Sequence, residues 1–280
     1  MKVFLTGGTG QLGSALINLL RDKNIEYSAP TRKELDLKNK EKIKCSISKY
    51  KPDIIIHSAA YTNVEKAELE KDLAYKVNVE STKWIAKSVK EIDAKLLYIS
   101  SDYVFDGKKE EAYENYDLPN PINYYGLTKY LGEKQIKTIT DKAFIIRTSW
   151  LYGKNGNNFV KNILKLTKSN QKIKVIDDQI GSPTYTNDLA ELILNIMKTK
   201  KYGIYHAVNE GFCSWYHFAL EIVRAKNIKV NVKAIKSEKF ISNIKRPKNS
   251  RLSTKSLENN GFNLLRNYKK ALKEYLDCEV

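Results

Sequence analysis

The chain has 280 residues, 42% of them hydrophobic, and a formal net charge of +17 at pH 7. This length allows one large domain, or a domain with a smaller lobe, around a sizeable core. No apolar run reaches the ~18 residues that span a bilayer, so we expect no membrane span. The first apolar residues run straight into glycines, so we expect no signal peptide. Three scattered cysteines and three histidines do not predict disulfides or a zinc site. Free thiols indicate a reducing, cytoplasmic compartment.

The positive charge raises the question of a nucleic-acid partner, because strongly basic chains can bind phosphate backbones. The lysines, however, are spread along the whole chain and alternate with acidic residues, as in residues 38–42 (KNKEK). This distribution is typical of solvated helix faces. We therefore expect no nucleic-acid partner, and a small anionic substrate accounts for part of the charge.

The first 13 residues, MKVFLTGGTGQLG, predict a strand, a glycine turn and a helix. In that order, glycines permit a tight turn and a close approach of backbone N–H groups to a dinucleotide pyrophosphate. Two frames fit: Gly8-x-Gly10-x-x-Gly13, of the general Rossmann type, and Gly7-x-x-Gly10-x-x-Gly13, of the short-chain dehydrogenase type. The glycines alone do not decide between them. A turn rich in glycine for packing only is the structural alternative.

The residues after the second predicted strand, residues 25–29, bear on the choice of cofactor. A unit that prefers NAD usually carries an acidic residue there, which binds the ribose 2′-hydroxyl. This chain has Thr31 and Arg32 instead, and a guanidinium can bind a 2′-phosphate through two hydrogen bonds. We therefore expect NADPH, with NADH as the alternative if Arg32 is merely an exposed loop residue. Asp36 and Leu37 then begin a stretch expected beside the adenine.

Strands and helices alternate along the first half of the chain, which predicts a Rossmann-type, doubly wound parallel α/β sheet. Further strands are expected at residues 53–60, 95–101 and 143–147, with helical patterns at residues 65–91 and 125–138. We assign residues 1–150 to an NAD(P)-binding Rossmann domain. Residues 151–280 form mostly a smaller C-terminal α/β substrate lobe, with some segments returning to the sheet.

Ser101, Tyr125 and Lys129 form the candidate catalytic set. Tyr125 and Lys129 are four residues apart and share one helix face. A lysine ammonium next to a phenol favours the phenolate, so we expect a Tyr125 pKa lowered from about 10 toward neutrality. Such a tyrosine can protonate a carbonyl oxygen while a hydride reaches the carbon, and the Ser101 hydroxyl can hydrogen-bond to the same oxygen.

The Tyr-x-x-x-Lys pattern is weak by itself, since Tyr130 and Lys134 also match it. Position decides between the two pairs. Tyr125 lies at the start of its helix, near the open edge of the sheet, and follows Ser101 by one crossover. Tyr130 lies in the middle of the helix and is interpreted as structural. The alternative for Tyr125 and Lys129 is a surface pair without a catalytic role.

These motifs together resemble the extended short-chain dehydrogenase/reductase family, and within it the family of dTDP-4-dehydrorhamnose reductases. The resemblance covers most of the chain in the correct order. The segments that carry it are TGGTGQLG (6–13), HSAAYTNVEKAE (57–68), SSDYVFDG (100–107), NYYGLTKYLGE (123–133), RTSWLYG (147–153), DDQIGSPTYT (177–186) and RPKNSRL (246–252).

The resemblance assigns a role to several residues of this sequence. It makes Ser101, Tyr125 and Lys129 the catalytic set, with Asn78 supporting the lysine. It implies that the cofactor is bound by Thr9, Gly10, Gln11, Leu12, Asp36, Leu37, Ala60, Tyr61, Thr62, Tyr125 and Lys129, to which the residue patterns themselves add Gly7, Arg32 and Ala59. It places the sugar against Thr62, Val64, Ser101, Asp102, Tyr103 and Trp150, and the thymidine diphosphate against Asn158, Gln179, Ser182, Pro183, Arg246 and Ser250.

The implied activity is the NADPH-dependent reduction of the C4 ketone of dTDP-4-dehydro-β-L-rhamnose to dTDP-L-rhamnose. The alternatives are a reductase of another 4-keto-deoxysugar nucleotide, and a non-catalytic regulatory subunit that binds NADP. Some family members dimerise through a magnesium ion held by glutamates, but Ala15 and Asn187 stand where two of those acids would be. We therefore expect no metal, and a monomer or homodimer.

Overall fold

The structure, a computed structural model, describes residues 1–239 and 244–278. Its main sheet has six parallel strands in the order β10-β5-β4-β3-β1-β2. These strands are β1 (Lys2–Thr6), β2 (Glu26–Ser28), β3 (Ile54–His57), β4 (Lys95–Ser101), β5 (Ala143–Thr148) and β10 (Gly203–His206). This arrangement confirms the predicted doubly wound α/β fold.

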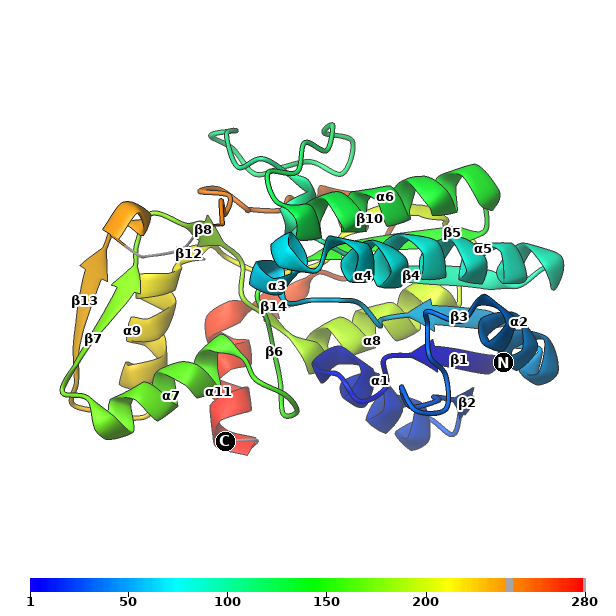
Figure 1. The fold of residues 1–280 in the computed structure, drawn as a ribbon. Coiled ribbons are helices and arrows are strands. Elements are labelled where there is room, and N and C mark those ends of the chain that lie inside the picture. The colour runs from blue at the N-terminus through cyan, green and yellow to red at the C-terminus, as the bar shows by residue number, and fades with distance from the viewer. Residues whose placement is uncertain (240–243, 279–280) are drawn as a thin grey trace.

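Helices cover both faces of the sheet (Figure 1). On one face lie α1 (Gln11–Asp22) and α8 (Thr186–Met197), which pack against each other. On the other lie α2 (Lys40–Tyr50), α5 (Ser81–Glu91) and α6 (Tyr124–Ile139). Because side chains alternate along a strand, neighbouring residues enter different cores. In β4, Leu97 belongs to the core with α1 and α8, whereas Leu96 and Tyr98 face α5 and α6.

The predicted helix over residues 65–91 is wrong as one continuous helix. The segment contains α3 (Val64–Leu69), α4 (Lys71–Tyr75), the π-helical turn η1 (Lys76–Glu80) and α5. Glu70 leaves the helical conformation, with φ −105° and ψ 51°, and its carboxylate accepts a hydrogen bond from the Tyr61 hydroxyl. A π-turn inside a helix often occurs at a functional site, and this one contains Asn78.

A second layer of structure follows β5 and lies beside the sheet, at the left of Figure 1. Its core is strongly aromatic and includes Tyr152, Tyr185, Phe218 and Tyr275. The strands are β6 (Leu151–Tyr152), β7 (Lys172–Ile176), β8 (Ile180–Gly181), β9 (Thr184–Tyr185), β11 (Asn209–Glu210), β12 (Cys213–Ser214), β13 (Asn231–Ile235) and β14 (Leu265–Asn267). The helices of this layer are α7 (Phe159–Ser169), α9 (Trp215–Ala225) and α11 (Tyr268–Cys278), with the short 3-10 turn η3 (Ser237–Lys239). The short helix α10 (Lys255–Glu258) packs against β10 of the main sheet, and the 3-10 turn η2 (Asp102–Val104) directly follows β4.

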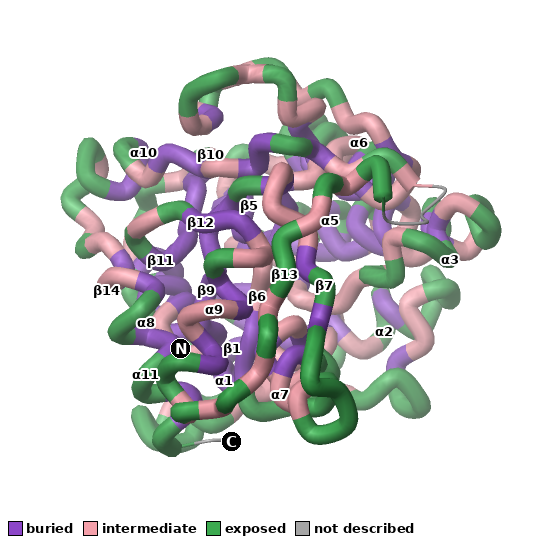
Figure 2. Tube along the Cα trace, turned by 90° about the vertical axis from the view of Figure 1, so that its left-hand side faces the viewer, coloured by how far each residue is buried: buried purple, intermediate pink, exposed green. Residues whose placement is uncertain are grey.

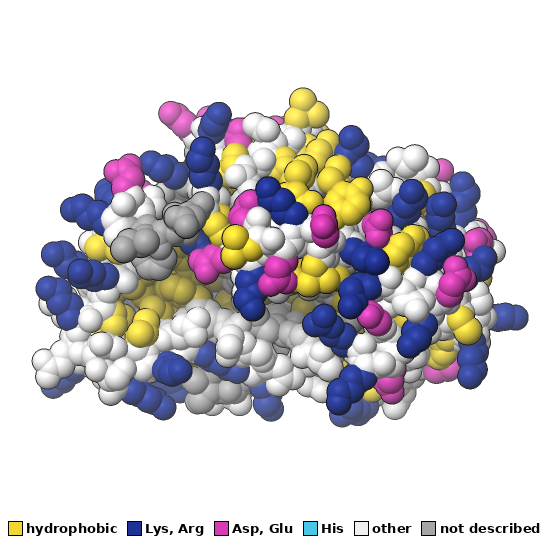
Figure 3. Space-filling model, in the orientation of Figure 1, with side chains coloured by type: hydrophobic (Ala, Val, Ile, Leu, Met, Phe, Trp, Pro, Cys, Tyr) yellow, Lys and Arg dark blue, Asp and Glu magenta, His cyan; other side chains and the backbone are white. Residues whose placement is uncertain are grey.

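Burial follows this arrangement. The strands of the main sheet form a nearly continuous buried centre, and exposed residues gather on helix surfaces and loops (Figure 2). On the face shown in Figure 3, lysine and arginine side chains are scattered and mixed with acidic ones. This face therefore carries no single basic patch of the kind that tracks a phosphate backbone. None of the helices within the described residues is long and apolar enough to cross a membrane.

Candidate active site

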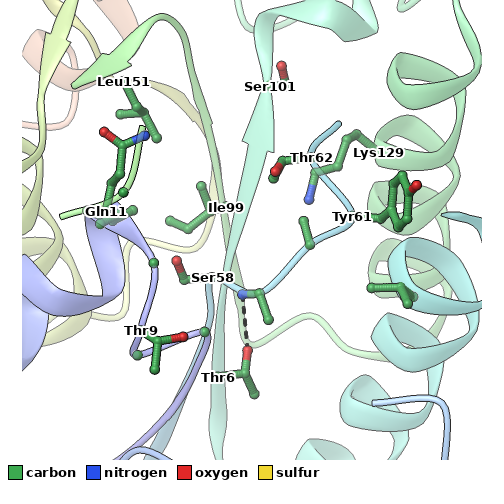
Figure 4. A pocket seen from close by; sticks show the side chains of 18 of the residues that line it. Thr6, Thr9, Gln11, Ser58, Tyr61, Thr62, Ile99, Ser101, Lys129 and Leu151 are labelled. Carbon is green, nitrogen blue, oxygen red and sulfur yellow. Dashed lines mark hydrogen bonds between the residues drawn. The ribbon is translucent and has the colours of Figure 1, made fainter. Parts of the chain in front are cut away.

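A cavity of about 620 Å³ lies at the C-terminal ends of β1, β3, β4 and β5. In a parallel sheet this edge is where ligands bind, because the loops diverge there. Figure 4 shows Thr9 and Gln11 on one side of it, Thr62 and Lys129 on the other, and Ser101 at the end of β4. The lining includes all three candidate catalytic residues and all fourteen candidate cofactor residues. Sequence reasoning missed other lining residues: Leu35, Val77, Ile99, Thr148, Leu151, Gly156 and Asn157.

The glycine turn leaves no space for side chains at two of its positions. Gly7 has φ +77°, and a Cβ atom there would lie 2.7 Å from the backbone nitrogen of Ala59. A Cβ atom at Gly13 would overlap the carbonyl oxygen of Gly7. At Gly8 the closest atom is only the flexible end of Ile17. Gly7 belongs only to the Gly7-x-x-Gly10-x-x-Gly13 frame and Gly13 to both frames, so the space at this turn favours the frame that begins at Gly7.

The turn leads directly into α1. No side chain caps this helix at Gly10, and its first turn contains no acidic residue. The N–H groups at its start are therefore free of a competing carboxylate and suit an anion such as a pyrophosphate. Arg32, Asp36 and Leu37 line the same cavity beyond β2. The backbone N–H of Lys38 lowers the pKa of Asp36, and the charge of Arg32 contributes to the same shift.

Ser101 and Tyr125 meet at the end of β4. The Ser101 hydroxyl donates to Oδ1 of Asp102 over 2.9 Å and accepts from the backbone N–H of Tyr103. It also hydrogen-bonds to the Tyr125 side chain. Tyr125 is located at the start of α6, where Asn123 caps the helix by accepting from the Gly126 N–H. The serine is thus held between the tyrosine and a buried carboxyl group.

The expected lowering of the Tyr125 pKa is wrong for this structure. Burial raises the pKa of Tyr125, and Asp102 and Tyr103 add to the rise, while the hydrogen bond with Ser101 opposes it. Burial also lowers the pKa of Lys129 to about 7, against the raising effect of Glu133. The lysine is therefore only partly charged at neutral pH, and desolvation outweighs its influence on the phenol.

Burial raises the pKa of Asp102 to about 6. The hydroxyls of Ser250 and Ser101 oppose this shift, because both hydrogen-bond to the carboxyl group. Asp102 lines the cavity directly next to Ser101. A carboxyl group that titrates near neutrality at this position can be either a hydrogen-bond donor or an acceptor, depending on pH.

Asn78 supports the site from the π-turn. Its side-chain oxygen accepts from the backbone N–H of Tyr61, and its amide donates to the carbonyl of Tyr61 and to the hydroxyl of Thr128. Thr128 directly precedes Lys129. Asn78 therefore links the loop after β3 to the helix that carries the lysine, rather than contacting the lysine ammonium itself.

The candidate sugar residues are divided between two places. Thr62, Ser101, Asp102 and Trp150 line the main cavity, whereas Val64 and Tyr103 do not. The ring of Tyr103 instead packs edge-on against Tyr125, with 5.8 Å between the centroids.

A second groove, of about 570 Å³, contains candidate diphosphate residues. Arg246 and Gln179 line it together with Lys108, Lys245 and Lys248. Arg246 also forms an ion pair with Glu65 at 3.1 Å and hydrogen-bonds to Tyr103. The groove offers an excess of cations for an anionic group, although Asp106 and Glu238 are part of its wall.

The position of Asn158 differs from the expectation of a substrate contact. Its side-chain oxygen caps α7 by accepting from the Lys161 N–H. Its amide donates to the carbonyl of Gly153 and, over 3.2 Å, to the side chain of Gln11. Asn158 is buried, so these contacts make it a link between α7 and the glycine turn.

Among the described residues, no group of three or more His, Cys, Asp or Glu side chains could hold a metal ion. Tyr130, whose motif competes with that of Tyr125, packs against the cluster around Phe105. The Asp177 carboxylate accepts a hydrogen bond from the Ser214 hydroxyl, and the Asp178 carboxylate accepts from the backbone N–H and the hydroxyl of Ser237.

Comparison with known proteins identifies the family. The model of the RmlD substrate binding domain matches residues 1–280. The chain belongs to the RmlD substrate binding domain family. Among curated members, the spore coat polysaccharide biosynthesis protein SpsK of Bacillus subtilis is 40% identical over 98% of this chain and 96% of its own length. A dTDP-4-dehydrorhamnose reductase of Aggregatibacter actinomycetemcomitans is 40% identical, with 92% of each chain covered.

Solved structures of RmlD family proteins have the same architecture. A dTDP-4-dehydrorhamnose reductase from Bacillus anthracis, in complex with NADP, superposes with a TM-score of 0.96 at 42% identity. The alignment covers 99% of this chain and 98% of that one. The family membership and the parallel sheet thus agree with the resemblance read from the motifs.

Proposed function

We propose that this chain reduces the C4 ketone of dTDP-4-dehydro-β-L-rhamnose to dTDP-L-rhamnose with NADPH. The observation that carries the proposal is the convergence of Ser101, Tyr125 and Lys129 at the end of a cavity whose other end is the glycine turn. The relative from A. actinomycetemcomitans is a dTDP-4-dehydrorhamnose reductase, which supports the same reaction. The NADP complex of the B. anthracis reductase supports the cofactor.

The residues present fit such a cofactor. The glycine positions and the uncapped start of α1 suit the pyrophosphate, and Arg32 supplies a cation for the 2′-phosphate. Asp36 and Leu37 would lie beside the adenosine, and Ala59, Ala60 and the loop to Thr62 would border the nicotinamide half. When bound, NADPH supplies the hydride.

Residues of the chain donate the proton that the reduction requires. Because burial raises its pKa, Tyr125 holds its proton at neutral pH and can donate it to the carbonyl oxygen. Ser101, next to the phenol, orients that oxygen with a hydrogen bond. Lys129, in its charged form, stabilises the phenolate that remains and would hold the nicotinamide ribose. A proton from water then restores the phenol.

The sugar nucleotide would extend from this centre toward the second groove. Trp150 offers an apolar surface for a deoxysugar, and Arg246 with its neighbouring lysines offers charge to the diphosphate. This arrangement is consistent with a Rossmann domain over residues 1–150 and a substrate lobe over most of 151–280. We propose cytoplasmic localisation, since the three cysteines are free thiols. We propose a monomer or homodimer without bridging magnesium, because Ala15 and Asn187 bring no carboxylate.

The test follows NADPH absorbance with enzymatically prepared dTDP-4-dehydrorhamnose. We expect oxidation by the wild type and a loss of at least about 100-fold in kcat for Tyr125→Phe. Tyr130→Phe is the matched control, because it removes a hydroxyl from the same helix and the same motif, and should stay active. Silence of the wild type with bound NADPH would overturn the reaction, and an active Tyr125→Phe variant would overturn the assigned acid.

A further inference from the structure

We propose that the aromatic face of Tyr98 seats the ammonium group of Lys129, which makes Tyr98 a positioning residue for the catalytic lysine. The inference rests on the proposed function only in giving Lys129 its catalytic role. The contact itself lies between two residues of the chain, one on the central strand β4 and one on α6.

The geometry is that of a buried cation–π pair. The Nζ atom of Lys129 lies 4.0 Å from the centroid of the Tyr98 ring, well inside the ~6 Å at which such pairs attract. Tyr98 is fully buried, and only 2% of Lys129 is exposed. Within the described residues, the ammonium forms no ion pair with a carboxylate. The ring thus places an electron-rich face within cation–π distance of this charge.

Tyr98 is held in this place by its surroundings on α6. A Cβ atom at Gly132 would lie 2.5 Å from the Tyr98 hydroxyl oxygen and 2.9 Å from the carbonyl oxygen of Asn78. A glycine at this position therefore lets the ring reach under the helix. The Tyr98 hydroxyl then donates to the carbonyl of Lys129 over 3.5 Å. The same tyrosine contacts both the backbone and the charged end of the lysine.

The neighbouring titratable groups explain why a π face is useful here. Burial lowers the pKa of Lys129 to about 7, while Glu133 on α6 raises it. Glu133, however, is bound to Arg147 by an ion pair of 2.8 Å. His57 on β3, 5.6 Å from the Tyr98 ring, has a pKa lowered to about 3 by burial and by Lys129. It is therefore neutral and adds no competing positive charge.

A ring face favours the charged form of the lysine over the neutral one, because its quadrupole attracts cations. The Tyr98 ring thus opposes the lowering of the Lys129 pKa by desolvation, and it keeps part of the Lys129 population charged near neutral pH. It also directs the long side chain. Figure 4 shows Lys129 extending from α6 toward the cavity, near Thr62 and below Ser101.

The experiment measures the titration of Lys129 without cofactor or sugar. The protein is labelled briefly with acetic anhydride at several pH values, and mass spectrometry quantifies labelling of the peptide that contains Lys129. Three variants are compared with wild type: Tyr98→Phe keeps the ring, pentafluorophenylalanine at position 98 keeps its shape but reverses its quadrupole, and Tyr98→Leu removes it. Phe144→Leu, in the neighbouring strand β5, controls for a cavity in the sheet.

We expect Tyr98→Phe and Phe144→Leu to titrate Lys129 as the wild type does. The fluorinated ring and Tyr98→Leu should lower the labelling midpoint by about one pH unit, and weaken NADPH binding above that midpoint. An unchanged midpoint with the fluorinated ring overturns the inference. So does an equal change for Tyr98→Phe, because the hydroxyl would then be responsible. Since the readout needs no sugar, failure of the proposed reaction is seen separately, in the NADPH oxidation assay.

Discussion

Trp150 and Trp215 stack face to face, with ring centroids 3.4 Å apart and planes inclined by 8°. Trp150 follows β5 with φ 46°, a backbone conformation that bulky residues rarely adopt. Trp215 begins α9 and also contacts Phe159. The edge of the Trp150 indole rests on Gly181, where a Cβ atom would lie 2.7 Å away. The stack therefore joins the end of the sheet to the substrate lobe and holds a strained residue at the cavity wall.

Removal of the second indole should release Trp150. We expect Trp215→Ala to abolish the exciton couplet of the stacked pair in the circular dichroism spectrum. The KM for the sugar nucleotide should rise about fivefold, with a smaller change in kcat, since an aromatic pair contributes about 1 kcal/mol beyond burial. Trp84→Ala, on α5, is the control and should leave the couplet intact. A normal KM after loss of the couplet would contradict a role of the stack in binding.

Arg32 should determine the choice between the two nicotinamide cofactors. It lines the cavity beyond β2. Its sequence neighbours are Thr31 and Lys33, and neither is the acidic residue that an NAD-binding unit usually carries here. We expect Arg32→Ala to raise the KM for NADPH by about tenfold or more and to leave the KM for NADH nearly unchanged, because only NADPH carries the 2′-phosphate. Steady-state kinetics with both cofactors measure this, and Lys33→Ala is the neighbouring control. Equal effects on both cofactors would show that Arg32 does not read the phosphate.

Asp102 should make stability depend on pH. Its pKa rises from 3.8 to about 6 on folding. The stability that protonation contributes is therefore complete below about pH 3.8 and is lost as the pH rises through about 6. The loss amounts to about 3 kcal/mol. We expect urea unfolding to show that Asp102→Asn is more stable than the wild type at pH 8. At pH 4 this advantage over the wild type should be much smaller. A parallel pH dependence of the two proteins would exclude this carboxyl group as its source.

Breaking the ion pair between Glu133 and Arg147 should strongly destabilise the fold. Both side chains are only 1% exposed, and Glu133 also accepts a hydrogen bond of 2.6 Å from Ser100. Glu133→Gln leaves the Arg147 charge uncompensated, and we expect the free energy of unfolding to fall by about 3–5 kcal/mol. Chemical denaturation measures this. Glu91→Gln breaks an exposed pair with Lys44 and should cost less than about 1 kcal/mol; a similar cost for both variants would contradict the prediction.

Local patterns were sufficient to predict much of this molecule. The continuous apolar strand at residues 53–60 and the glycine turn at Gly7–Gly13 indicated a parallel sheet with a dinucleotide edge. The spacing of Tyr125 and Lys129 put both on one helix face. These properties depend on short-range periodicity and on the steric limits of the backbone, which a sequence displays directly.

What the tertiary structure decided concerns groups that are distant in sequence. The direction of the Tyr125 pKa depends on burial, which is a property of the packed site and not of the Tyr-x-x-x-Lys spacing. Tyr98 meets Lys129 across a strand and a helix, and Trp215 meets Trp150 across 65 positions of chain. Desolvation and long-range packing arise only when the chain is folded. The sequence by itself could therefore identify the reacting residues, but it could not show which groups surround them.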